Sequence, residues 1–580
     1  MKYLNIILFL YSISVFAQIN LKYEENICPT YEEAINYYKY LDEKFEEAKL
    51  FECEKTDIGK PLHLFVISSD KDFNPISIKE KNKRIILINN GIHAGETCGI
   101  DASLQLSNDF LFEVLDKDLL ENIVLCIIPV YNVGGYLNRS SFGRVNQIGP
   151  EEYGFRANGK NINLNRDFTK CDTENSKSFA KIFHEWEPNI FIDTHTSDGA
   201  DYSYVMTLIP VHYLRLTEPL GLFLKDEMIP SLYRKMEEKK WEMIPYVMPF
   251  KQFPEDGIRA SFASPRFSSS FTGLFNTIGF MSEAHMYKTY KERVLATYNF
   301  ILSTIEFTDE NYIKFGELKN EADENLKNQN EFFLTYERDT TKYDMIKFKG
   351  YEVKYKTSSV TNKDIYYYDQ NAPYEKEIKY YNYYKEKFSV KKPEYYIVPQ
   401  AWSEVIELLK INNVKMSRLS EDSKIIVEVY YIRDCKTSKR ETDFHYYHED
   451  FRIEIDTQEI QFFKGDYVIQ TNQIANKYIV EMLEPKGEDS FFRWNFFDPI
   501  LQRHEYFEPY VFDEIADEIL KSDQKLRDEF EKKKLNEIDF AQNSYAQYDF
   551  IYRNSPHYEE CHQRYPVYRL NGKINLSLEL

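Results

Sequence analysis

The residues that could do chemistry in this sequence start with His93 and Glu96, which lie three positions apart in the stretch 89–96. This stretch follows an apolar run at 85–88 and precedes a segment with helical spacing. It is therefore predicted to form a glycine-containing loop between a strand and a helix. An imidazole nitrogen and a carboxylate oxygen are both ordinary ligands of Zn²⁺. Because His-x-x-Glu pairs arise often by chance, this pair alone indicates a metal site only weakly.

Other parts of the chain complete the candidate site. They contribute His195, Glu283 and, from the loop 156–168, Arg156, Asn165 and Arg166. His195 and Glu283 each follow a short apolar run that is predicted to be a buried strand. In open α/β sheets, ligands gather at the carboxyl ends of the strands. The shared position of these residues is a stronger indication of a site than any single motif.

The candidate ligands define a catalytic rather than a structural metal site. His93, Glu96 and His195 would leave the fourth position on Zn²⁺ open for water. The metal lowers the pKa of that water to about 7 and polarises a carbonyl group. Glu283 is then available to take the proton of the water and to pass it to the departing amine.

Three further residues suit a substrate that carries negative charge. Arg156 would stabilise the developing oxyanion. Asn165 and Arg166 suit a fixed carboxylate, because a guanidinium binds one through two parallel hydrogen bonds. Carboxylate recognition beside a metal-bound water indicates hydrolysis next to a free C-terminus.

These motifs resemble the M14 family of zinc carboxypeptidases. The resemblance rests on His-x-x-Glu, an Arg-x-Asn loop that runs into Asn-Leu-Asn-Arg-Asp-Phe, a distant His and a late Glu, and it covers roughly residues 31–308. It implies an α/β/α fold with a mixed eight-stranded sheet, one Zn²⁺ per chain and a peptide substrate with a free C-terminus. It assigns the roles derived above to the same residues: ligands His93, Glu96 and His195, general base Glu283, oxyanion contact Arg156, and carboxylate contacts Asn165 and Arg166.

The sequence departs from the family pattern at two places. Many members carry an Asp two residues before the Asn-Arg pair, where it orients a zinc-binding histidine; here that position is Asn163. A neutral acceptor would orient the ring but raise its basicity less. The tyrosine that closes over the substrate in digestive members has no evident counterpart before Glu283, although Arg266 lies in that segment.

Other candidates have plainer interpretations. Arg144 is interpreted as a solvated loop residue in preference to a second anion contact, and His285 as a packing or supporting residue in preference to a ligand. His445, His448 and Glu449 imitate a metal motif but lack a third ligand in a strand-loop setting, so a solvated face is predicted there.

The length of 580 residues predicts more than one domain. Strands that alternate with helices up to about residue 308 predict an α/β domain with a mostly parallel or mixed sheet. The later part is rich in tyrosine and is similar to an accessory region of a bacterial exported M14 subgroup. The expected organisation is a signal peptide at 1–17, a catalytic domain at 18–310, a charged linker at 311–347, a β-rich region at 348–485 and a mainly helical segment at 486–580.

The net charge and the N-terminal sequence restrict the possible binding partners and the cellular compartment. The net charge of −21 argues against nucleic acid and anionic membranes, which bind basic surfaces. Lys2, the apolar stretch 3–15 and the small-residue site ending at Ala17 predict a cleaved signal. The apolar stretch is too short to span a membrane comfortably. We therefore expect a mature chain without a membrane span, exported to the periplasm or the cell exterior.

The seven cysteines are scattered and predict no dense disulfide framework, with Cys28 and Cys53 as the pair favoured by sequence proximity. The oligomeric state does not follow from the sequence.

Two other functions stay open at this stage. The same scaffold would serve a zinc-dependent deacylase or amidase that acts on small acyl-amino acids or cell-wall peptides. Alternatively, the tyrosine-rich part would act as a binding module, although tyrosine as a filler of β-sheets is the plainer interpretation.

Overall fold

The computed structural model describes residues 21–572 and 576–579, so the expected signal peptide lies outside the described residues. The described chain forms two units. The first comprises the residues up to 329 together with 335–388, and the second comprises 330–334 together with the residues from 389 onward. All candidate site residues belong to the first unit.

The predicted buried strands of the first unit join in one eight-stranded sheet with the order β1-β2-β4-β3-β5-β9-β6-β7. Strands β4, β3, β5 and β9 are parallel neighbours, whereas β1, β2 and β6 pair antiparallel and make the sheet mixed. The strands are β1 (Ala48–Lys55), β2 (Pro61–Ile67), β3 (Arg84–Asn89), β4 (Ile123–Ile128), β5 (Ile190–Ser197), β6 (Met206–Pro210), β7 (Met243–Pro245) and β9 (Ile278–His285).

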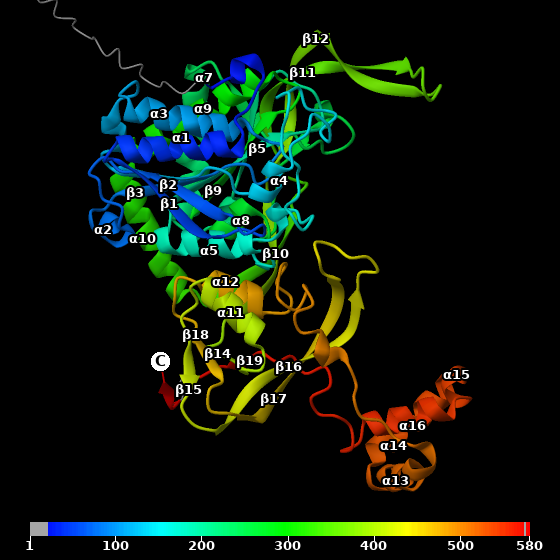
Figure 1. The fold of residues 1–580 in the computed structure, drawn as a ribbon. Coiled ribbons are helices and arrows are strands. Elements are labelled where there is room, and N and C mark those ends of the chain that lie inside the picture. The colour runs from blue at the N-terminus through cyan, green and yellow to red at the C-terminus, as the bar shows by residue number, and fades with distance from the viewer. Residues whose placement is uncertain (1–20, 573–575, 580) are drawn as a thin grey trace, which may run out of the picture. The chain divides into compact units, whose positions relative to one another are not determined.

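Helices cover both faces of this sheet (Figure 1). One face carries α1 (Tyr31–Lys44), α3 (Cys98–Leu111) and α9 (Tyr290–Glu310), and the other carries α5 (Glu174–Trp186) and α8 (Ser268–Gly273). Shorter helices are α2 (Pro75–Glu80), α4 (Val133–Leu137), α6 (Leu220–Phe223) and α7 (Ile229–Glu238). The prediction of an α/β/α domain with a mixed eight-stranded sheet is confirmed.

Local sequence signals account for these elements. Every residue of β3, β4 and β5 is buried, as continuous apolar runs predict for strands covered on both faces. Helix α1 starts at a capping box, in which Thr30 and Glu33 satisfy each other's backbone N–H groups. It ends at Lys44, because residues from Ala48 onward form the edge strand β1 against β2.

A long hairpin extends from the first unit (Figure 1). It is formed by β11 (Asp344–Thr357) and β12 (Asp364–Tyr381), and β8 (Ile258–Arg259) pairs with β12. Buried aromatic and aliphatic residues anchor its base, among them Phe348, Ile378 and Tyr202. The hairpin therefore belongs to the same unit as the eight-stranded sheet, and most of its sequence lies in the predicted β-rich region 348–485.

The predicted charged linker, 311–347, contains regular structure. Helix α10 (Tyr312–Asn328) lies there, followed by β10 (Glu331–Arg338), which pairs with β13 (Tyr384–Lys391) where the chain passes between the units. Phe315, Ala322 and Leu326 are buried on one side of α10. The many charged residues of the segment leave a narrow apolar stripe, which explains why composition suggested a linker.

The second unit has a seven-stranded sheet with the order β17-β16-β19-β14-β18-β15-β20. The strands are β14 (Tyr395–Val398), β15 (Ser417–Leu419), β16 (Ser423–Thr437), β17 (His448–Phe462), β18 (Tyr467–Gln470), β19 (Tyr568–Leu570) and β20 (Leu578–Glu579). The helices are α11 (Ser403–Ile411), α12 (Asn476–Leu483), α13 (Pro509–Ser522), α14 (Gln524–Asn536), α15 (Ile538–Ala541) and α16 (Ser544–Arg553). Most of the strands of this unit precede residue 486, and four of its helices follow that residue.

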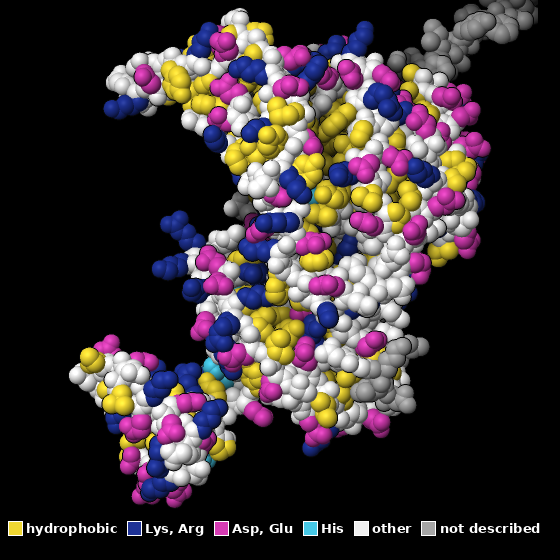
Figure 2. All heavy atoms as spheres, turned by 180° about the vertical axis from the view of Figure 1, so that it is seen from behind, with side chains coloured by type: hydrophobic (Ala, Val, Ile, Leu, Met, Phe, Trp, Pro, Cys, Tyr) yellow, Lys and Arg dark blue, Asp and Glu magenta, His cyan; other side chains and the backbone are white. Residues whose placement is uncertain are grey.

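The surface carries charges of both signs. On the face seen in Figure 2, acidic and basic side chains are interspersed. Among the helices of the described residues, none combines the length and apolarity that crossing a bilayer requires.

The favoured disulfide does not form in the structure. Both Cys28 and Cys53 are free, and the Cys28 thiol donates a hydrogen bond to the Glu152 carbonyl at 3.1 Å. Cys53 lies on the edge strand β1. Proximity along the sequence was misleading because helix α1 separates the two residues.

The predicted solvated face of the second unit is only partly solvated, because Glu449 is exposed but His448 is buried. His448 is 1% exposed, and its Nε2 lies 2.8 Å from Asp498 Oδ1 while its Nδ1 lies 2.8 Å from Thr437 Oγ1. Burial lowers the pKa of His448, but the hydrogen bonds that the imidazole makes to Asp498 and Cys435, together with the negative charges of both groups, outweigh this effect and raise the pKa to about 9. The ion pair is a structural contact of the second unit.

Substitution Asp498→Asn should therefore lower stability in a pH-dependent way. A histidine whose folded pKa lies above its ordinary value of about 6.5 adds stability below pH 6.5 that is lost as the pH rises through about 9. Because Asp498 is 41% exposed, we expect a modest loss of roughly 1–2 kcal/mol at pH 6 and little difference above pH 10. Calorimetric unfolding of the full chain, with the exposed Asp528→Asn as control, tests this; equal losses at both pH values would contradict it.

Candidate metal and active site

The three candidate ligands lie close together although they come from distant parts of the chain. His93 and Glu96 occupy the loop between β3 and α3, and His195 lies on β5, which pairs with β3. Their ligand atoms all lie within 4.8 Å of one another, and all three side chains are buried. Parallel pairing of β3 with β5 brings the two segments to the same edge of the sheet.

Both histidines direct Nδ1 toward Glu96. His93 Nδ1 lies 3.2 Å from Glu96 Oε1, and His195 Nδ1 lies 3.1 Å from Glu96 Oε2. The far nitrogens are held by polar side chains: His93 Nε2 lies 3.0 Å from Asn163 Oδ1, and His195 Nε2 lies 2.8 Å from Asp193 Oδ2. A ring whose far nitrogen is hydrogen-bonded presents its near nitrogen to a metal in a fixed orientation.

The donor set fits a bound Zn²⁺. His93 Nδ1 is buried and makes no hydrogen bond, although it faces the other two ligand groups. Buried polar atoms normally have a partner, so this nitrogen is suited to coordination. Two imidazole nitrogens and one carboxylate also match the three protein ligands of catalytic zinc sites.

Glu96 is ionised in a mainly apolar setting because positive groups surround it. Burial alone would raise its pKa, but the charges of His93 and Arg144, with the hydrogen bond from His195, hold the pKa well below its ordinary value. Arg144 and Arg156 each approach Oε1, at 3.0 and 3.2 Å. The backbone N–H of Thr196 donates to Oε2 at 2.9 Å.

Arg144 is therefore not the solvated loop residue that the sequence suggested. Its side chain is only 12% exposed and packs against Gly95, whose missing Cβ leaves space for it. A Cβ at position 95 would lie 2.5 Å from Arg144 Cδ and 2.9 Å from the Gly154 carbonyl oxygen. The sequence signal that was overlooked is the glycine directly before the ligand Glu96.

Glu283 lies on β9 directly opposite His195 in the parallel pair β5–β9, so both side chains face the same side of the sheet. Burial raises the pKa of Glu283 to about 7; the positive charge of His195 opposes this effect, and the negative charge of Glu96 adds to it. A carboxyl group with a pKa near neutrality can both accept and release a proton.

The substrate-binding candidates sit on a short turn, residues Leu164–Arg166. Asn163 caps this turn by accepting from Asn165 N at 3.1 Å, with the same oxygen that contacts His93. Arg166 stacks on the ring of Phe267 at 3.9 Å from its centroid and donates to the Asn165 carbonyl at 2.7 Å. The turn thus links the carboxylate-binding pair to a metal ligand.

Asn165 and Arg156 also reach the candidate site. Asn165 Nδ2 lies 3.5 Å from His195 Nε2, and its Oδ1 accepts from Ser268 N at 3.0 Å. Arg156 is half exposed beside Glu96, which suits a contact to an incoming substrate. The structure thus brings all the predicted site residues to one edge of the sheet.

Two residues near the site were overlooked in the sequence. Asp193 lies two positions before His195 on the same strand, so alternation along the strand would have placed it on the same face. Tyr246 follows β7, and its pKa is raised by burial and then by the negative charge of Glu283. His285, by contrast, stacks on Tyr202 at 4.1 Å between ring centroids, in agreement with a packing role.

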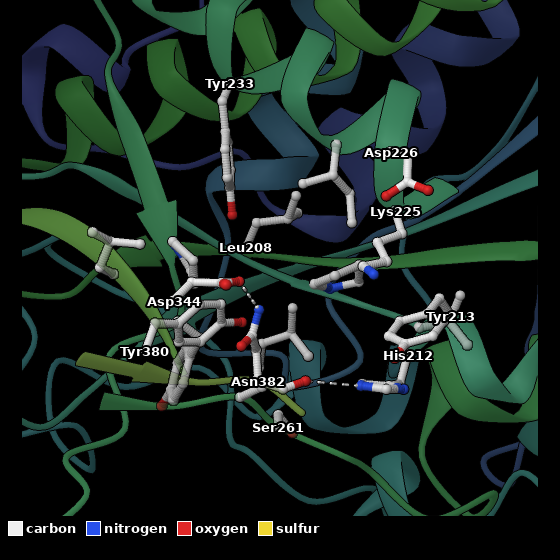
Figure 3. A pocket seen from close by; sticks show the side chains of 18 residues that line it. Leu208, His212, Tyr213, Lys225, Asp226, Tyr233, Ser261, Asp344, Tyr380 and Asn382 are labelled. Atoms are coloured by element: carbon white, nitrogen blue, oxygen red, sulfur yellow. Dashed lines mark hydrogen bonds between the residues drawn. The ribbon is translucent and has the colours of Figure 1, made fainter. Parts of the chain in front are cut away.

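A cavity of about 400 Å³ lies beside β6 and the segment that follows β7. Its walls are largely apolar and aromatic, and the side chains of Tyr233 and Lys225 point into it (Figure 3). Tyr246 is one of its lining residues, whereas none of the predicted ligand, base or substrate-binding residues is. The cavity is thus near the candidate site but separate from it.

A buried His-Glu-His donor set and a second carboxylate with a raised pKa lie together at the strand ends of an α/β sheet, and these are the groups that a metal-dependent hydrolase requires. Residues 35–197 match the Peptidase_M14 family model, which describes zinc carboxypeptidases. This part of the chain therefore matches the zinc carboxypeptidase domain of the M14 family. The matched range contains His93, Glu96 and His195, whereas Glu283 lies beyond it.

Several solved structures are similar to this chain. A metallo-carboxypeptidase from Burkholderia cenocepacia is 15% identical with a TM-score of 0.37, and the similarity covers 50% of this chain and 71% of that chain. Carboxypeptidase A from Helicoverpa armigera is 16% identical with a TM-score of 0.36, covering 52% and 76%. A metallo-carboxypeptidase from Pseudomonas aeruginosa, in complex with (2-guanidinoethylmercapto)succinic acid, is 13% identical with a TM-score of 0.38, covering 50% and 71%. No curated protein sequence matches significantly.

Substitution Gly95→Ala should displace Arg144, because the new Cβ overlaps the arginine side chain. We expect a loss of roughly 1–3 kcal/mol in the free energy of unfolding, which is typical of overpacking. The double variant Gly95→Ala/Arg144→Ala should lose less than the sum of the two single variants, since it removes the clash. Chemical unfolding of the four proteins measures this coupling, and strictly additive losses would contradict the packing explanation.

Proposed function

We propose that this protein is an exported zinc metallocarboxypeptidase that removes C-terminal residues from peptides. The observation that carries the proposal is the meeting of three groups at one edge of the sheet: the His93, Glu96 and His195 cluster, the carboxyl group of Glu283, and the Asn165–Arg166 turn. Such a site can bind a free carboxylate and cleave the adjacent peptide bond.

His93, Glu96 and His195 would hold the metal. When bound, Zn²⁺ polarises the scissile carbonyl group and lowers the pKa of water to about 7. Glu283 accepts a proton from the attacking water and transfers it to the nitrogen of the leaving amine. Its pKa of about 7 suits both the acceptance and the release of the proton.

Two arginines of the site would each contact a different negative group of the substrate. Arg156 is the half-exposed cation beside Glu96 and would stabilise the oxyanion that forms at the carbonyl. Arg166 has its guanidinium plane set by Phe267, and with Asn165 it would bind the terminal carboxylate. Binding the terminal carboxylate would position the last peptide bond for cleavage.

Export rests on the sequence of residues 1–17, with cleavage after Ala17. Expression of the full chain in a bacterial host, followed by fractionation and N-terminal mass spectrometry, tests this part. A mature protein that starts at Gln18 outside the cytoplasm is expected, and an uncleaved cytoplasmic chain would contradict export.

The variant Glu283→Gln should fold and bind metal but lose nearly all peptide hydrolysis. Removal of a general base lowers the rate by about 10²–10⁴-fold. Release of the C-terminal residue from a peptide library, followed by mass spectrometry, measures this and also reports residue preference. Glu80→Gln, an exposed change on α2, is the matched control and should retain activity. Full activity in Glu283→Gln would refute the assigned base.

A free C-terminus should be the main determinant of substrate choice. We expect kcat/KM to fall at least 10²-fold when a peptide is amidated at its C-terminus, because Arg166 then loses a charged partner. In Arg166→Gln the difference between acid and amide should largely disappear, whereas the exposed Arg234→Gln on α7 should keep it. Equal cleavage of both forms by the unchanged protein would instead favour a deacylase or amidase.

A further inference from the structure

The two histidines of the metal site are supported by chemically different groups. His93 Nε2 faces the neutral amide oxygen of Asn163 at 3.0 Å, whereas His195 Nε2 faces the carboxylate of Asp193 at 2.8 Å. Both contacts set the orientation of the ring, but only the carboxylate brings a negative charge. The difference lies in the chain's own residues and exists without a metal. Its effect would be on the affinity for a metal.

Asp193 is built into the sheet as a fixed acceptor. It is 0% exposed, and Asn89 Nδ2 and Ser268 Oγ donate to its oxygens at 3.0 and 2.6 Å. Both of these donors are neutral, so they orient the carboxylate without cancelling its charge. The charge is therefore directed at the imidazole of His195 and at the cation which that imidazole would bind.

Asn163 cannot supply a corresponding charge to His93. Its single side-chain oxygen is shared between His93 Nε2 and the backbone N–H of Asn165. It serves to tie the substrate-binding turn to the ring of His93. A hydrogen bond to an ionised acceptor is roughly twice as strong as one to a neutral acceptor, so His195 is polarised more strongly than His93.

We propose that Asp193 is a positioning residue that supplies, through His195, the supporting negative charge of the metal site, while Asn163 only orients His93. The inference rests on the proposed zinc function and deepens it by assigning the electrostatic support to one side of the site. Loss of such a supporting group lowers metal affinity by about 10–100-fold.

The proposal makes opposite predictions for two isosteric substitutions. Asp193→Asn keeps an acceptor beside His195 but removes its charge, so zinc affinity should fall about 10–100-fold. Asn163→Asp adds a charge beside His93, so zinc affinity should rise. The double variant keeps the total charge unchanged but places the carboxylate beside His93 instead of His195. Its zinc affinity should lie between those of the single variants.

Competition for Zn²⁺ between each full-length protein and a chromophoric chelator at fixed pH measures these affinities without using activity. Ser268→Ala is the matched control, because it removes a hydrogen bond to Asp193 but leaves the charge in place. A merely structural role for Asp193 predicts similar losses in Ser268→Ala and Asp193→Asn, whereas the proposed role predicts a much smaller loss in Ser268→Ala. Asn163→Asp keeps the proposal testable if Asp193→Asn does not fold.

The outcomes separate this inference from the proposed function. If the unchanged protein takes up no zinc, both fail together. If it binds zinc but Asp193→Asn binds equally well, or Asn163→Asp binds no more tightly, only the assignment of the supporting charge is overturned.

Discussion

The site depends on one buried carboxylate, that of Glu96. It lies in the loop between β3 and α3 and faces one histidine through each oxygen, His93 at 3.2 Å and His195 at 3.1 Å. An ionised carboxylate in a buried position is costly unless it is paired and hydrogen-bonded. The histidines and arginines around it supply this pairing. The histidines are also the groups that would bind a metal, and the arginines are the groups that would contact a charged substrate.

The parallel pairing of β3, β5 and β9 gives this cluster its geometry. Because β5 lies between the other two, one edge of the sheet gathers the His93–Glu96 loop, His195 and Glu283. Burial of that edge has a second consequence, since it raises the pKa of Glu283 to about 7. The packing that stabilises the sheet thus also tunes the group proposed to transfer the proton.

Three arginine side chains lie at the site of a chain that is acidic as a whole. The chain has a net charge of −21, yet Arg144 and Arg156 converge on one oxygen of Glu96. Arg166, held on Phe267, adds a third guanidinium on the neighbouring turn. A negatively charged peptide terminus would be repelled by the molecule as a whole and attracted by this site, so electrostatics would act over a short range.

Much of the fold and of the site could be predicted from the sequence, because short-range patterns report local chemistry. Apolar runs marked the strands, a capping box marked the start of α1, and the types and order of His93, Glu96, His195 and Glu283 indicated a metal-dependent hydrolase. Only the tertiary structure decided which groups support them. The contacts of Asp193 with His195, of Asn163 with His93 and of Arg144 with Glu96 depend on strand register, on a capped turn and on the space left by Gly95. Those features arise when distant segments pack, and sequence spacing alone does not record them.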